Sequence, residues 1–262
     1  MTPASTVTLL YHSVYRTLDT GDSYDIRAEA FEDHVRIIRD KGVRCIPPEK
    51  IVNPEGRPEE SGKHVILTFD DGRIDNHEVV FPILTEYDFH AFFFVNPDRV
   101  GTTGYMDWTH LADLDRHGMS IQSHGLTHRY LHLLPLRELE LELEESKRAI
   151  EDRIGKQVDF LSVPGGFYSR GVMESAWSLG YRGMFTSDPG IDRIDRPAQA
   201  TLFHRYNISR DTSRAEVAGL LSQKMGIRFR RQATHAIKRG VRKALGTEAY
   251  HWLWTNLRKY SR

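Results

Sequence analysis

Strand-like and helix-like segments alternate along most of this chain, and that rhythm restricts the possible folds more than any other feature of the sequence. Short runs of apolar residues are followed by longer segments in which apolar residues recur at helical spacing. Parallel sheets covered by helices show this alternation, because each strand is joined to the next by a crossover helix. Strands are expected at residues 6–11, 43–46, 65–69, 91–95, 119–122, 160–163 and 181–186, and the clearest helix at 137–154.

The number and length of these units favour a barrel. About seven βα units occupy about 200 residues, with no internal linker and no sequence repeat, which suits a TIM-like barrel, closed or incomplete, better than an open sheet. The single cysteine, Cys45, excludes intrachain disulfides, thiolate zinc fingers and iron–sulfur clusters. A metal ion in this protein would therefore need nitrogen and oxygen ligands.

Charge is divided unevenly along the chain. The 36 Lys and Arg residues equal the 36 Asp and Glu residues, but residues 215–262 hold 11 basic and 2 acidic residues, a balance of +9. The first 214 residues therefore hold 25 basic and 34 acidic residues, a balance of −9. We expect a globular domain at 1–214 without a basic surface for nucleic acid, followed by a basic tail at 215–262.

The first residues do not resemble a secretory leader. They lack a basic n-region, and residues 6–11 suit a strand better than the apolar core of a leader. The longest apolar stretches, such as residues 91–95, fall far short of the ~20 residues that span a bilayer. These features predict a cytoplasmic protein, unless a leader has been removed.

Two adjacent carboxylates end the apolar run at 65–69. Asp70 and Asp71 follow this strand directly, and Gly72 lets the backbone turn sharply after them. Strand ends of this kind carry the catalytic residues of α/β barrels. Taken alone, an Asp-Gly pair is most simply a turn.

A pair of histidines after another expected strand changes that interpretation. His124 and His128 are four residues apart, so their imidazoles can converge on one metal ion. Two imidazoles and one carboxylate with an open position form a hydrolytic site, and neutral imidazole suits Zn²⁺ or another borderline divalent ion. Asp71 is the expected third ligand, while Asp70 stays off the metal as general base. Both motifs at strand ends in one chain favour a metal site over two surface histidines.

A third cluster follows the strand at 160–163. Gly165 and Gly166 allow close backbone approach to a ligand, so one of their N–H groups can stabilise an oxyanion, although a plain loop explains the glycines nearly as well. Aromatic residues near the expected loop ends, Tyr168 among them, suit a carbohydrate, and core packing also explains them. Gly165 and Tyr168 are therefore the candidate substrate-binding residues.

These three motifs, in this order, resemble those of the polysaccharide deacetylase family, also described as the NodB homology domain or carbohydrate esterase family 4. The resemblance runs over roughly residues 6–206 and rests on Thr68-Phe69-Asp70-Asp71-Gly72, His124-Gly125-Leu126-Thr127-His128 and Pro164-Gly165-Gly166. It implies a deformed (β/α)7 barrel and metal-dependent removal of acetyl groups from N-acetylated sugars. It also implies that Asp70 is the base and that Asp71, His124 and His128 hold the metal.

The chain departs from the family pattern at the third and later motifs. Many members carry an arginine two residues before the proline of the third motif, where it orients the base, and this chain has Ser162 there. The Asp-Trp fourth motif and the Leu-x-His fifth motif are not clearly present. Asp188 and Arg205 are candidates to replace the missing partners, and either is equally explained as a loop charge.

Two histidines compete for the role of general acid. His12 ends the first expected strand on the same barrel face as the metal ligands. The chain resembles the branch of the family with a Tyr-His opening, and this resemblance implies that His12 lies near the metal. Its alternative role is to hydrogen-bond a neighbouring loop. His204 has the letters of the Leu-x-His motif in Leu202-Phe203-His204 but arrives early in the chain.

The function expected from these motifs is hydrolysis of the N-acetyl group of an amino sugar in a glycan or glycan precursor, with release of acetate. An ester deacetylase or another amide or imide hydrolase on the same scaffold is an alternative, since fold and metal do not fix the acyl acceptor. A catalytically inactive glycan-binding module is a third interpretation, suggested by the altered third motif. The intact Asp70, Asp71, His124 and His128 argue against it.

The basic tail has the pattern of an amphipathic helix. Its apolar residues Ala236, Ile237, Val241, Ala244 and Leu245 recur at helical spacing among basic residues, and Tyr250, Trp252, Trp254 and Tyr260 follow. This composition is typical of a segment that lies on an anionic membrane surface. A helical extension packed on the acidic barrel is the alternative, because opposite charges within one chain attract.

Overall fold

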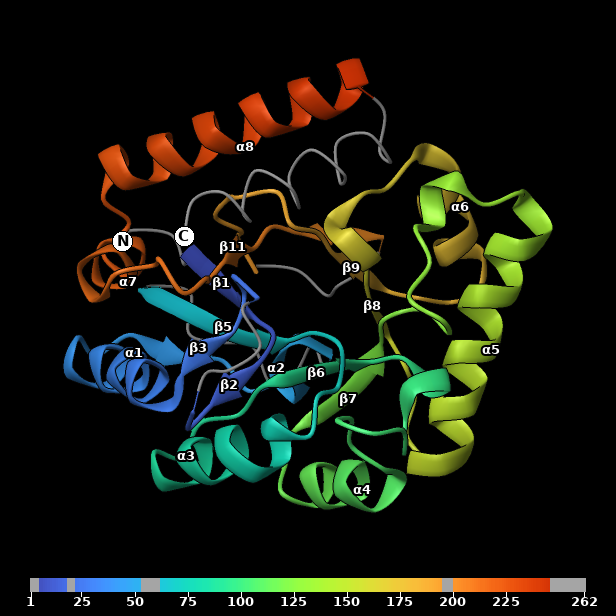
Figure 1. Cartoon of the computed structure of the whole chain (residues 1–262), viewed down its shortest axis with the longest axis horizontal. Coiled ribbons are helices and arrows are strands. Elements are labelled where there is room, and N and C mark those ends of the chain that lie inside the picture. Colours follow the sequence, from blue (N-terminus) through green and yellow to red (C-terminus); the bar gives the residue numbers. More distant parts are fainter. Residues whose placement is uncertain (1–4, 18–21, 53–61, 195–199, 246–262) are drawn as a thin grey trace.

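The computed structural model describes residues 5–17, 22–52, 62–194 and 200–245 of the chain (Figure 1). The strands are β1 Ser5–Tyr11, β2 Val14–Tyr15, β3 Ile26–Arg27, β4 Arg44–Cys45, β5 Lys63–Phe69, β6 Phe92–Val95, β7 Ser120–Ser123, β8 Phe160–Ser162, β9 Gly183–Phe185, β10 Thr201–Phe203 and β11 Tyr206–Asn207. The helices are α1 Ala28–Asp40, α2 Glu49–Val52, α3 Phe81–Glu86, α4 Trp108–Arg116, α5 Leu136–Ile154, α6 Arg170–Ser178, α7 Arg214–Leu221 and α8 Met225–Leu245.

The main sheet is parallel and curls into the predicted deformed (β/α)7 barrel. Its strand order is β10-β9-β8-β7-β6-β5-β1-β11, with β4 beside β5. The strands β10 and β11 are the two edges of this path, yet only His204 and Arg205 separate them in sequence. Three Cα steps span at most about 11 Å, so the chain itself draws the two edges together and closes the barrel.

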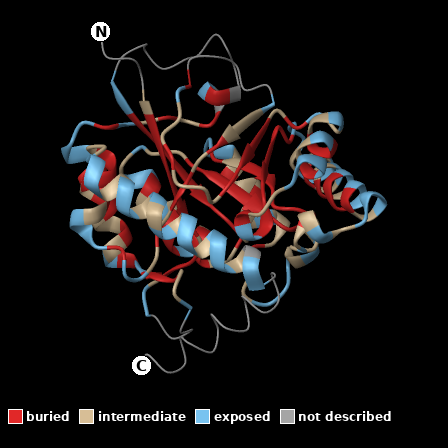
Figure 2. Cartoon of the chain, turned by 90° about the horizontal axis from the view of Figure 1, so that it is seen from above, coloured by how far each residue is buried: buried red, intermediate tan, exposed pale blue. Residues whose placement is uncertain are grey.

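The helices bury one face against the outside of the sheet. Figure 2 shows buried residues throughout the strands and on the inner sides of the helices, with exposed residues on the outside. The helix α5 illustrates the pattern, because Leu139, Leu143 and Ile150 are buried while charged residues cover the rest. The helix α7 shares this core, since Val217 and Leu220 belong to the same apolar cluster.

Aromatic side chains fill the interior of the barrel. A separate buried cluster contains Ile66 together with five phenylalanines, which are Phe92, Phe94, Phe160, Phe185 and Phe203. The rings of Phe185 and Phe203 stack at a centroid distance of 4.5 Å, and Phe92 meets Phe160 edge to face. This apolar filling keeps water away from the polar groups at the carboxyl ends of the strands.

The expected elements differ from the structure mainly at short strands. The strand expected at 43–46 is only Arg44–Cys45, and the one expected at 181–186 is Gly183–Phe185. The strands β10 and β11 were not expected, because runs of two or three residues carry no periodicity. The strand expected at 65–69 begins two residues earlier, at Lys63 of β5.

None of the helices within the described ranges combines the length and the apolar character needed to cross a bilayer.

Candidate active site

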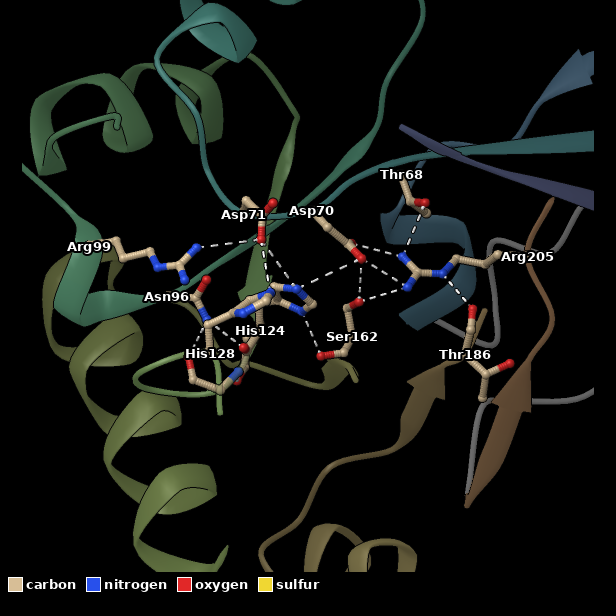
Figure 3. A network of polar contacts seen from close by, with 12 residues as sticks. Thr68, Asp70, Asp71, Asn96, Arg99, His124, His128, Ser162, Thr186 and Arg205 are labelled. Carbon is tan, nitrogen blue, oxygen red and sulfur yellow. Dashed lines mark hydrogen bonds and ion pairs between the residues drawn. The ribbon is translucent and has the colours of Figure 1, made fainter. Parts of the chain in front are cut away.

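The paired aspartates lie at the carboxyl end of β5 and point in different directions (Figure 3). Asp71 has a φ of 76°, a left-handed conformation that non-glycine residues rarely adopt, and Gly72 follows with a φ of 71°. This turn directs Asp70 toward the barrel axis and Asp71 toward the histidines of the neighbouring loop. Strained residues of this kind are concentrated at functional sites.

Asp71, His124 and His128 form the one group of possible metal ligands found among the described residues. The Asp71 Oδ1 atom lies 3.2 Å from His128 Nε2 and 3.6 Å from His124 Nε2, and all three atoms lie within 4.8 Å of one another. Oδ1 of Asp71 is buried and has no hydrogen-bond partner in the part of the chain described. A buried, unsatisfied carboxylate oxygen facing two imidazoles fits a divalent cation, and the N,N,O donor set suits Zn²⁺.

His124 is oriented for such a role by its second nitrogen. Its Nδ1–H donates to the Ser162 carbonyl at 2.8 Å, which leaves Nε2 to face Asp71. Burial lowers the pKa of His124 to about 4, so the imidazole is neutral at pH 7. Metal binding requires this neutral form.

The loop that carries His128 is held by two buried polar residues that the sequence analysis did not identify. Asn96 donates through Nδ2 to the carbonyls of His124 and Gly125. Glu142 of α5 accepts hydrogen bonds from the backbone N–H groups of Leu126 and Thr127, each at 3.0 Å. Asn96 is the first residue after β6, so its position after a strand was the available sequence signal.

Asp70 is bound by an arginine from the far side of the barrel. Arg205 Nη1 lies 2.8 Å from Asp70 Oδ1, and Arg205 Nη2 lies 3.0 Å from Oδ2 (Figure 3). Ser162 joins this pair, because its hydroxyl donates to Asp70 Oδ2 at 2.8 Å and accepts from Arg205 Nη2 at 2.8 Å. The Arg205 Nε–H donates to the Thr186 carbonyl at 2.7 Å, which fixes the plane of the guanidinium.

This ion pair lies on the aromatic interior and is almost fully buried. The Arg205 Cζ atom is 5.8 Å from the centre of the Phe94 ring and 5.9 Å from that of Phe185. Burial alone would raise the pKa of Asp70, but Arg205 and His124 more than offset burial and hold that pKa below its usual value. Asp70 is therefore ionised at neutral pH and held in one position.

The structure distinguishes Asp188 and Arg205, the two candidates to replace the partners missing from the third and later motifs. Arg205 binds Asp70, the expected base, from the segment between β10 and β11. Asp188 instead accepts a hydrogen bond from the Tyr168 hydroxyl at 3.1 Å and pairs with His235 of α8 at 2.8 Å. Arg205 therefore takes the place that an arginine at position 162 holds in many family members.

The turn after β8 requires its glycines. Gly165 has a φ of 68°, and a Cβ atom there would come within 2.5 Å of the Tyr130 ring. Gly166 has a φ of 74° and leaves no room for a Cβ atom beside Ser187. The Gly166 N–H donates to the Val163 carbonyl at 2.8 Å, so Gly165 offers the candidate backbone donor of this turn. Substrate binding by Gly165 and Tyr168 stays a prediction, and the Tyr168 hydroxyl faces Asp188.

The two candidate general acids lie in different surroundings. His12 follows β1, which pairs with β5 beside the two aspartates, and stacks on Tyr24 at 5.0 Å between ring centres. Its buried Nδ1 atom has no hydrogen-bond partner among the described residues. His204 is bound to Asp192, with Nδ1 and Oδ1 2.7 Å apart, and this bond raises its pKa.

Comparison with known proteins agrees with this geometry. The family model for polysaccharide deacetylases matches residues 57–184, which include both aspartates, both histidines and the glycine turn. The protein YxkH of Bacillus subtilis (strain 168) is 28% identical over 210 residues, covering 79% of this chain and 72% of its own length.

Two solved structures share the fold. The Streptococcus pyogenes deacetylase PplD in complex with acetate superposes with a TM-score of 0.72 and 23% identity, over 82% of this chain and 96% of that one. IcaB from Ammonifex degensii superposes with a TM-score of 0.70 and 23% identity, over 84% of this chain and 99% of that one. Motifs, fold and family model together make this chain similar to the polysaccharide deacetylases.

Proposed function

We propose that this protein is a metal-dependent deacetylase that hydrolyses the N-acetyl group of an amino sugar, in a glycan or a glycan precursor, and releases acetate. The observation that carries the proposal is the division of labour between neighbouring aspartates. Asp71 faces two imidazoles with an unsatisfied oxygen, whereas Asp70 is held off that group by Arg205 and Ser162. A hydrolase of this kind needs one carboxylate as ligand and one as base.

Asp71, His124 and His128 are the residues that would hold the cation. When bound, a divalent cation supplies Lewis-acid chemistry, because it polarises the acetyl carbonyl and acidifies a water molecule. Asp70 borders the same space, since its Oδ2 atom lies 4.0 Å from His124 Nε2. From there Asp70 takes the proton of the attacking water, and Arg205 keeps the carboxylate ionised and aimed.

The other residues act on the charges that develop during the reaction. The Gly165 N–H, in the turn after β8, would stabilise the oxyanion of the tetrahedral intermediate. His12 donates a proton to the leaving amine, because it follows β1 beside the end of β5 that carries both aspartates, and its buried Nδ1 is not used by the described residues. Acetate and the free amino sugar are the products.

The family relationship supports this choice of bond. The fold is shared with a deacetylase that was solved with acetate, the expected product here. Zn²⁺ is the proposed cation, because two imidazoles and one carboxylate are ligands that it prefers.

The test measures acetate release from N-acetylglucosamine oligomers by the full chain, before and after chelation and after Zn²⁺ is added back. Asp70→Asn removes the proton acceptor, so we expect a fall in kcat of about a hundredfold or more with the cation retained. Asp40→Asn is the matched control, because Asp40 lies exposed at the end of α1 and is expected to keep wild-type turnover. O-acetylated oligomers assayed in parallel separate an amidase from an esterase.

Three results would contradict the proposal. The first is turnover by Asp70→Asn at the wild-type rate. The second is activity that survives complete chelation. The third is acetate release from O-acetylated oligomers alone, which would assign the ester deacetylase instead.

A further inference from the structure

The helix α8 is oriented opposite to an ordinary amphipathic helix. It lies outermost on its side of the molecule, along one flank of the barrel (Figure 1). Its inner face is polar, because Arg231 Nε donates to Glu216 Oε1 at 2.6 Å and Arg231 Nη1 donates to the Asn207 carbonyl at 3.1 Å. His235 continues this face through its ion pair with Asp188. The barrel and α8 are thus joined by charge, in agreement with the packed extension considered from the sequence.

Ile227 of α8 packs against the core, but five large apolar residues of the helix face solvent. We define the outer stripe as Met225, Phe229, Ile237, Val241 and Leu245, which are 80%, 71%, 68%, 39% and 46% exposed. Their spacing in multiples of four makes successive members neighbours on the helix surface, in a row that winds gradually across its outer side. A helix packed on a core normally buries such a row, so its exposure along six turns indicates a surface that binds something apolar.

The charges of α8 restrict what that surface can bind. The 21 residues of the helix include seven Lys and Arg residues and no Asp or Glu, and two of the seven, Arg230 and Arg231, are paired with Glu216 of α7. Two copies of the chain that met through this stripe would bring these basic residues together, and their repulsion disfavours a dimer. An anionic lipid bilayer complements both properties, because its acyl region takes the apolar row and its headgroups attract the flanking cations.

We propose that the outer stripe of α8 docks the protein onto the surface of an anionic membrane, with the helix lying in the plane of the interface. The inner face stays bound to the barrel through Arg231 and His235, so docking does not require α8 to leave its place. The inference is independent of the proposed deacetylase reaction, since it concerns binding alone.

The test is cosedimentation of the full chain with vesicles. Vesicles of phosphatidylglycerol and phosphatidylcholine are compared with vesicles of phosphatidylcholine alone. The double variant Phe229→Gln/Ile237→Gln removes the two bulkiest well-exposed side chains near the middle of the stripe, and we expect at least about tenfold weaker binding to anionic vesicles. Leu136→Gln/Leu141→Gln is the matched control, since both leucines are similarly exposed on α5, and its binding is expected to equal that of the wild type.

Salt and the oligomeric state complete the experiment. Binding to anionic vesicles should weaken between 50 and 500 mM NaCl, roughly the range over which the Debye length falls several-fold. Equal binding by the stripe variant, or no binding by the wild type, overturns the proposal. A dimer that forms without lipid and disappears in the stripe variant, measured by light scattering after gel filtration, also overturns it and assigns the stripe to a second copy.

Discussion

Arg205→Met removes the guanidinium that holds Asp70 while it keeps most of the side-chain volume. The wild-type guanidinium makes two bonds to Asp70, one to Ser162 and one to the Thr186 carbonyl, in a position with no solvent exposure. Without it, Asp70 is a buried carboxylate with one remaining hydroxyl donor, Ser162. Breaking a buried pair by removing one partner typically costs about 3–5 kcal/mol, because the other charge stays buried.

Burial and loss of the arginine both raise the pKa of Asp70 in this variant, so the carboxyl group becomes protonated and stops acting as a base. We therefore expect a loss of about 3–5 kcal/mol in the free energy of unfolding and at least a hundredfold fall in kcat. Arg205→Lys keeps the positive charge but not the planar fork, and a smaller loss of about 1–2 kcal/mol is expected.

Urea unfolding at pH 7 and acetate release are the two assays, each with and without Zn²⁺. Arg214→Met is the control, because Arg214 is exposed and pairs with Asp33 only at 3.5 Å, a contact worth less than about 1 kcal/mol. If Arg205→Met unfolds at the same urea concentration as the control, the ion pair contributes nothing to stability. If Arg205→Met also keeps wild-type kcat, the assignment of Arg205 as the positioning residue of the base is wrong.

Three further predictions concern the metal group and a buried histidine. His128→Ala should lose most bound Zn²⁺, and its melting temperature should lie within a few degrees of that of the chelated wild-type protein. Full metal content by elemental analysis would exclude His128 as a ligand. Arg99→Gln should tighten Zn²⁺ binding up to about tenfold, because Arg99 Nη1 lies 3.8 Å from Asp71 Oδ1 and its charge opposes a cation there. Chelator competition measures the Zn²⁺ affinity, and an unchanged affinity would show that the Arg99 charge is screened. Burial lowers the pKa of His34 from 6.5 to about 4, so unfolding takes up a proton and stability falls as the pH drops from 6.5 to 4. His34→Phe should remove up to about 3 kcal/mol of this loss. Urea midpoints that fall as much in the variant as in the wild type between pH 7 and 4.5 would refute this prediction.

Strand-end motifs made the metal group predictable from sequence. Asp71, His124 and His128 each follow a strand that is largely buried, and parallel strands end at one face of the barrel. Residue type and strand position were therefore enough to bring them together. The same reasoning applied to Asn96 would have placed it beside them, but a single amide after a strand suggests no chemistry of its own.

The partner of Asp70 depended on information that local sequence does not carry. Arg205 lies 135 residues after Asp70. It reaches the barrel axis only because the two edge strands, β10 and β11, are brought together across two residues. Strands of two or three residues have no readable period, so this closure and the direction of Arg205 were not predictable.

The orientation of α8 shows a related limit. Its apolar and basic faces were both visible in the sequence, but not which of them meets the barrel. Membrane association and packing on the barrel were treated as alternatives because a helix was assumed to use one face. The structure packs the basic face and leaves the outer stripe exposed, so the two interpretations are compatible.

Ser162 and Arg205 are best understood as one feature of the site. The Ser162 Oγ atom contacts both Asp70 Oδ2 and Arg205 Nη2 at 2.8 Å, so a guanidinium extending from position 162 would compete with Arg205 for the same carboxylate. Two buried guanidinium groups facing one carboxylate leave a net positive charge in an apolar interior, which is strongly unfavourable. A small residue at position 162 is therefore the condition for an arginine at position 205. The serine in the third motif thus accompanies a relocated arginine, and it no longer argues for an inactive glycan-binding module.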